Sequence, residues 1–203
     1  MQPKLSDMLT TRQKITKLLY PLIVFFSKKD TSKGKVLKNT EKAKAPASFF
    51  DLKAIANNGK EISMNEYRGK KIILVNTASN CGYTGQYDEL EKLYQENKDK
   101  LVILGFPAND FKNQEAGSDK EIEQFCRVNF GVTFPLFKKQ SVLKPNQEPV
   151  FKWLTDEKQN GWNKQEPVWN FSKYIIDETG NLTGFYGSAV SPLGKEIKDG
   201  LGE

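Results

Sequence analysis

Two cysteines are the residues of this chain best suited to redox chemistry, because histidine is absent from all 203 positions. Without histidine, Ser-His-Asp catalysis, Cys-His catalysis and histidine-held metal or haem are excluded. Two thiols, Cys81 and Cys126, argue against a four-ligand zinc site and against a disulfide-rich secreted scaffold. We therefore expect no metal and no cofactor, and any cysteine chemistry must use these two residues.

Cys81 lies between a continuous apolar stretch at 71–77 and an amphipathic stretch at 84–97. The first predicts a strand covered on both faces, and the second predicts a helix capped by Thr84. The N-terminus of a helix presents free N–H groups and partial positive charge, which favour a thiolate. This position indicates a reactive cysteine, and a structural thiol is the alternative interpretation.

Cys126 falls on the apolar stripe of a second expected helix, beside Ile122 and Phe125. A capping box at 118–121 predicts the start of that helix. A cysteine at such a position is usually buried and unreactive.

The order of the elements predicts the fold. A strand-helix-strand unit of buried strands implies a right-handed crossover and parallel pairing, and a closing hairpin adds antiparallel strands. We therefore expect an α/β, thioredoxin-like fold, with a mixed central sheet, helices on both faces and an N-terminal hairpin. The further expected elements are a hairpin within 48–64, a strand at 101–106, an edge strand at 133–137, a helix at 149–154, a hairpin at 174–187 and a last helix opening at Ser191-Pro192.

The net charge of +6 is unevenly distributed. Residues 1–46 hold 11 Lys+Arg and 3 Asp+Glu, whereas residues 47–203 hold 20 and 22. The basic charge belongs to the tail, so the globular part offers no reason to bind nucleic acid. We divide the chain into a basic tail at 1–46, whose residues 27–46 are a linker, and a catalytic domain at 47–203. We expect deletion of the tail to leave activity nearly intact.

The tail contains a nine-residue apolar segment, LLYPLIVFF at 18–26, with basic residues on both sides. Nine residues are too few for a membrane-spanning helix, which needs roughly 20. Three interpretations stay open: contact of residues 12–29 with a membrane surface, packing on the chain's own domain or a partner, and an export signal with a poor cleavage site. We expect a cytoplasmic location, with or without membrane association.

Three ordered motifs resemble the signatures of the glutathione peroxidase family. The segment NTASNCGYT at 76–84 resembles its active-site signature. FPANDF at 106–111, followed by Gln114-Glu115 and Gly117-Ser118, is similar to the second, and Trp169-Asn170-Phe171 to the third. The resemblance spans about residues 48–200. It implies the thioredoxin-like fold and the reduction of hydroperoxides.

The resemblance also implies site roles. Cys81, Gln114, Trp169 and Asn170 match the residues that carry the family's chemistry. A Cys81 thiolate would attack one peroxide oxygen and become a sulfenic acid, while the other oxygen leaves as water or alcohol. The three neighbours are uncharged donors that can hold thiolate and peroxide without a histidine base.

Cys126 is similar to the resolving cysteine of the family's thioredoxin-dependent members. This similarity implies an internal disulfide with Cys81 that thioredoxin reduces. The alternatives are a glutathione-dependent cycle on one cysteine and a peroxide sensor that passes oxidation to a partner protein. Ala108 stands where many relatives carry another cysteine, and Asp110 stands where they commonly carry glutamine.

Overall fold

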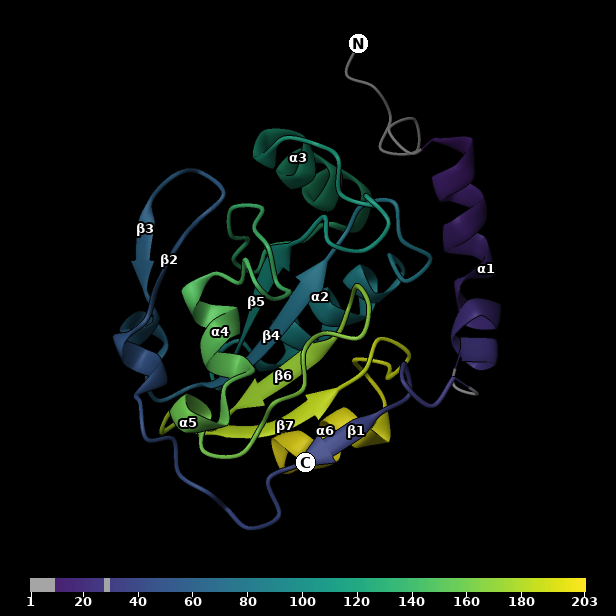
Figure 1. Cartoon of the computed structure of the whole chain (residues 1–203). Coiled ribbons are helices and arrows are strands. Elements are labelled where there is room, and N and C mark those ends of the chain that lie inside the picture. Colours follow the sequence, from purple (N-terminus) through teal and green to yellow (C-terminus); the bar gives the residue numbers. More distant parts are fainter. Residues whose placement is uncertain (1–9, 28–29) are drawn as a thin grey trace.

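Five strands form a mixed sheet at the centre of the computed structural model, which describes residues 10–27 and 30–203 (Figure 1). Their order is β1-β7-β6-β4-β5, with β4 and β5 parallel and the other neighbouring pairs antiparallel. The strand bounds are Val36–Lys38 (β1), Lys71–Thr77 (β4), Leu101–Pro107 (β5), Lys173–Ile176 (β6) and Leu182–Tyr186 (β7). The expected parallel pair and closing hairpin are confirmed.

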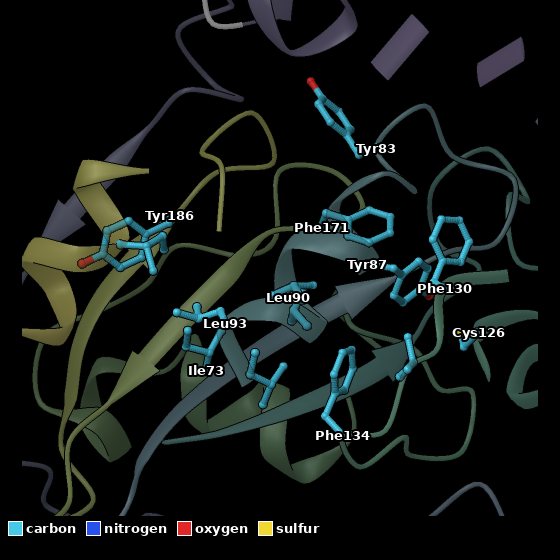
Figure 2. Packing of buried hydrophobic residues seen from close by; sticks show 14 of the residues in the cluster. Ile73, Tyr83, Tyr87, Leu90, Leu93, Cys126, Phe130, Phe134, Phe171 and Tyr186 are labelled. Carbon is cyan, nitrogen blue, oxygen red and sulfur yellow. The ribbon is translucent and has the colours of Figure 1, made fainter. Parts of the chain in front are cut away.

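Alternate side chains of β4 enter two separate apolar cores. Ile73 and Val75 pack with helices α2, α3 and α6, whereas Ile72 and Leu74 pack on the opposite face with α4. Figure 2 shows the first core. Burial on both faces explains why β4 is a continuous apolar run, and it confirms a sheet with helices on both sides. The helix bounds are Gln86–Asn97 (α2), Asp119–Phe130 (α3), Pro149–Leu154 (α4), Glu157–Asn160 (α5) and Lys195–Leu201 (α6).

The helix boundaries confirm one capping prediction and overturn another. The Ser118 hydroxyl accepts a hydrogen bond from the Glu121 N–H, and the Glu121 carboxylate accepts one from the Ser118 N–H, so α3 opens with the expected capping box. Thr84 does not cap α2, which begins after Gly85 without a side-chain cap. The chain instead forms successive turns over 81–85, and these turns delay the helix.

The N-terminal hairpin forms a sheet of its own from β2 (Lys53–Ile55) and β3 (Glu61–Ser63). Short 3₁₀ turns at Phe49–Asp51 and Met64–Tyr67 flank it. The prediction of an edge strand at 133–137 is wrong. This segment instead makes two isolated bridges, Gly105 with Leu136 and Ala56 with Phe137. Pro135 comes directly before Leu136 and Phe137 and has no N–H for a continuous ladder.

The last helix starts later than expected. The prediction that it opens at Ser191-Pro192 is wrong, because a turn closed by the Gly194 N–H on the Ser191 carbonyl precedes α6.

Part of the expected linker belongs to the sheet. Strand β1 pairs with β7, with Leu37 opposite Phe185. The Gly187 N–H donates to the Lys35 carbonyl, which extends the attachment beyond the strand. The interpretation of 27–46 as a linker is therefore wrong for residues 36–38. The division of the chain at residue 46 stays a prediction.

The tail also forms a helix, α1 (Thr11–Ser27), that lies along the side of the protein (Figure 1). The Tyr20 hydroxyl donates to Glu89 at 2.7 Å, and Lys17 pairs with Asp88 at 3.0 Å. The Tyr20 ring covers Gly85, where an added Cβ would lie 2.5 Å from it. Among the described residues, no helix is long and apolar enough to cross a membrane.

We expect two truncations to differ. Deletion of residues 1–29 removes α1 and leaves the sheet intact, whereas deletion of 1–46 also removes β1 and exposes the edge of β7. Each kcal/mol lost lowers the Tm of a domain of this size by about 2–4 °C, so the longer deletion should melt clearly lower. Thermal unfolding of both variants tests this, and equal Tm values would show that β1 adds nothing.

Candidate active site

Cys81 lies in the turns between β4 and α2, and its side chain is only 1% exposed. It belongs to the apolar core that also contains Ala78 and Tyr83. The Tyr83 N–H points at the Cys81 sulfur, at 3.5 Å. The thiol is thus removed from water and depends on protein groups for any polar contact.

Trp169 and Asn170 precede β6, and the side chains of both act to lower the pKa of the Cys81 thiol. The Asn170 amide also donates to the Gln114 side-chain oxygen at 2.9 Å. The main chain of Gln114 is tied to the same turn, because its carbonyl accepts from the Asn80 N–H at 3.0 Å. The structure brings all four residues together, with Gln114 reaching the thiol through Asn170.

Burial dominates the electrostatics of the thiol, raising the pKa of Cys81 to about 11. The Tyr83 N–H, Asn170, Trp169 and the charge of Lys33 act in the opposite direction without cancelling it. The expectation that a helix N-terminus favours the thiolate is not met. Cys81 lies five residues before the first residue of α2, and the loss of water outweighs the polar contacts.

Cys126 is completely buried in α3, and both thiols are free. Burial raises its pKa to about 12, while the neighbouring Tyr87 hydroxyl acts to lower it. Figure 2 shows Cys126 near Tyr87 and Phe130, in the same apolar core that contains Cys81. The structure therefore gives Cys126 the surroundings of a packed thiol in the reduced protein.

Three residues near the site had no role assigned from sequence. Glu115 accepts hydrogen bonds from the Ser79 N–H at 2.8 Å and hydroxyl at 3.1 Å, and burial raises its pKa to about 7. Asn76 bonds the segment that carries Trp169. Asn76 lies in the first motif and Glu115 in the second, so the motifs could have marked both residues.

The third such residue is Lys33, in the tail, which lies 5.5 Å from the centre of the Trp169 ring. No local pattern marks it, because its place at the site depends on the pairing of β1 at the sheet edge. Asp110 has a structural explanation: its carboxylate accepts from the Ser141 hydroxyl at 2.6 Å and from the Val142 N–H at 3.1 Å.

The site is thus a buried thiol beside uncharged side chains, in the turns that follow a central strand. The family model for glutathione peroxidase matches residues 49–155. A glutathione peroxidase of Lactococcus lactis is 43% identical over 154 residues, covering 74% of this chain and 98% of the relative. The glutathione peroxidase-like peroxiredoxin HYR1 of Saccharomyces cerevisiae is 41% identical over 160 residues, covering 77% and 98%. The chain belongs to the glutathione peroxidase family.

Solved structures agree with the fold. The crystal structure of Trgpx in its apo form is 35% identical, with a TM-score of 0.58, and covers 75% of this chain and 92% of that one. A thioredoxin family protein from Chlorobium tepidum matches at a TM-score of 0.51 and 15% identity, covering 79% and 97%. The second similarity shows the fold alone. The thioredoxin-like fold expected from the sequence is confirmed.

We expect the alkylation of Cys81 to be slow at neutral pH and to accelerate with pH. Only the thiolate reacts, so a pKa near 11 predicts a rate with iodoacetamide that rises about tenfold per pH unit from pH 7 to 10. The measurement uses Cys126→Ser, so that one thiol is followed, with circular dichroism confirming the fold at each pH. A rate that levels off below pH 8 would contradict the effect of burial.

Proposed function

We propose that Cys81 is the residue that reduces hydroperoxides. The observation that carries this proposal is a buried sulfur atom that the Tyr83 N–H faces at 3.5 Å and whose pKa the side chains of Asn170 and Trp169 act to lower. The sulfur attacks one peroxide oxygen as the O–O bond breaks, giving a sulfenic acid and water or an alcohol. The thiol proton ends on the departing oxygen, so the step needs no external base.

The uncharged donors have a defined task in this step. Negative charge develops on sulfur and then on the departing oxygen, in a place that excludes water. Donors already oriented in such a site stabilise that charge more strongly than water would. The Gln114 bond to Asn170 holds the amide in place, while Trp169 lies against Phe111 with ring centres 5.4 Å apart.

Cys126 is the resolving residue in this proposal. Its thiol condenses with the sulfenic acid to form the Cys81–Cys126 disulfide and release water. A disulfide requires the two α-carbons to come within about 7 Å, and both thiols are packed in the core, so in this proposal α3 and the turns at 81–85 loosen. The dithiol of thioredoxin then reduces this disulfide by exchange, becoming oxidised itself.

Two single substitutions test the cycle. Cys81→Ser should fold normally and lose peroxidase turnover, because a hydroxyl is a poor nucleophile here. Cys126→Ser should reduce one equivalent of peroxide, then stop turning over with thioredoxin and over-oxidise at Cys81. Mass spectrometry of the oxidised wild type should show the loss of two hydrogens. Free or singly oxidised cysteines in its place would refute the two-cysteine cycle.

Glutathione is the rival electron donor, and a sensor that oxidises a partner protein is the rival function. The proposed internal disulfide favours thioredoxin, since thioredoxin acts on disulfides and glutathione on a sulfenic acid left unresolved. A steady-state assay with both donors separates them. Turnover with glutathione that survives in Cys126→Ser would establish the one-cysteine cycle, and oxidation of a partner without turnover would establish the sensor.

The outward face of α1 supports a second proposal, contact of residues 12–29 with an anionic membrane surface. Four apolar side chains at helical spacing are exposed there: Ile15 at 53%, Leu18 at 80%, Leu19 at 42% and Leu22 at 55%. The opposite face holds Lys17 and Tyr20 against the domain. The excess of positive charge in residues 1–46 complements anionic lipid. This contact is compatible with the expected cytoplasmic location.

Flotation with vesicles tests the membrane contact. We expect the wild type to float with vesicles containing phosphatidylserine and to stay behind with phosphatidylcholine alone. Leu18→Glu should abolish flotation, because it places a charge in the middle of the apolar stripe. Ile55→Glu on β2, another exposed aliphatic position at 38%, is the matched control and should float. Equal flotation of both variants would contradict the proposal.

A further inference from the structure

Asn76 is a polar residue in a place that otherwise holds apolar side chains. It is the sixth residue of β4, is completely buried, and precedes Cys81 by five positions. A buried amide is costly unless its donors and acceptor are paired. Its partners therefore show what the residue does in the folded protein.

Outside its strand ladder, Asn76 bonds one short segment of the described chain, the segment that contains Trp169 and Asn170. The Asn76 amide donates to the Trp169 carbonyl at 3.2 Å, and its side-chain oxygen accepts from the Ser172 N–H at 3.0 Å. Its main chain bonds the same segment, accepting from Phe171 at 2.6 Å and donating to the Ser172 carbonyl at 3.3 Å. Asn76 thus holds the segment at both ends.

This segment needs such support because its backbone is strained. Phe171 has a φ of 65°, in the left-handed region that side chains with a Cβ rarely adopt. Its ring lies against Tyr87 (Figure 2), and the two ring centres are 5.1 Å apart. The main-chain bonds fix Phe171 and Ser172, whereas the Trp169 carbonyl is held by two side chains, Asn76 and the Ser172 hydroxyl at 2.9 Å. Without the Asn76 amide, the end of the segment that carries Trp169 loses a support.

We infer that Asn76 is a positioning residue for the peroxidase reaction, acting through Trp169 and Asn170 to keep their donors aimed at the Cys81 sulfur. The inference rests on the proposed function of Cys81. Asn76 need not touch the peroxide. Its two side-chain bonds fix the segment from which both donors project, and a displacement of about 1 Å in such groups can cost about 10²-fold in rate.

The test uses Asn76→Ala and Asn76→Asp. Asn76→Asp keeps the shape of the side chain and the acceptor for the Ser172 N–H but removes the amide donor. It replaces Asn76→Ala in the test if the alanine variant does not fold. Stopped-flow oxidation of Cys81 by one equivalent of hydrogen peroxide should slow by roughly 10- to 100-fold in both. In a Cys126→Ser background, the rate at which Cys81 reacts with iodoacetamide across pH 7 to 10 should be lower with Asn76→Ala, because the donors that stabilise the thiolate are less well placed. Reduction of the preformed disulfide by thioredoxin should be unchanged.

Asn160→Ala is the matched control. Asn160 is also fully buried and makes four side-chain hydrogen bonds, to Trp153, Trp162 and twice to Asn163, in a part of the fold that does not contact Cys81. It should lower the Tm without changing the oxidation rate or the pH profile. Asn76 variants that behave like this control would overturn the inference. Failure of wild-type Cys81 to react with peroxide would instead overturn the proposed function.

Discussion

A buried sulfur atom can react with a peroxide only if the protein groups around it stabilise the developing charge, as water would in solution. This constraint organises the site: Cys81 lies among apolar side chains, and burial keeps its proton in place. The donors that offset burial are Tyr83, from the same turns, and Trp169 and Asn170, from a distant segment. Reactivity therefore depends on how accurately the two segments are held together, which is a property of the sheet more than of the cysteine.

Strand β4 meets that requirement by pairing with β5 on one side and β6 on the other. Cys81 follows β4, and Trp169 and Asn170 precede β6, so the antiparallel pairing of the two strands brings the segments to one end of the sheet. Ile73 and Ile72 anchor β4 in the two cores. The support of the site is therefore a strand that is buried from Ile72 to Thr77.

The sequence predicted the parts whose signals are local. The strands at 71–77 and 101–106 are apolar runs, and the capping box at 118–121 is a short pattern with a direct physical meaning. The errors have both distant and local causes. Residues 36–38 form β1 only because β7 offers an edge, and Gly85 precedes α2 because the turns at 81–85 position Cys81. The four candidate residues were found through motifs, whereas Lys33 reaches Trp169 through the tail.

The burial of Cys126 has a further consequence for the energetics of the proposed cycle. Its thiol is packed in the same core as Cys81, so a disulfide between them would give up contacts that the reduced protein keeps. Reduction would restore those contacts, and their free energy would add to the driving force for electron uptake. Each 1.4 kcal/mol of packing regained corresponds to about 30 mV of reduction potential. The packing of the apolar core around α3 would thus help to set the reduction potential of the oxidised enzyme.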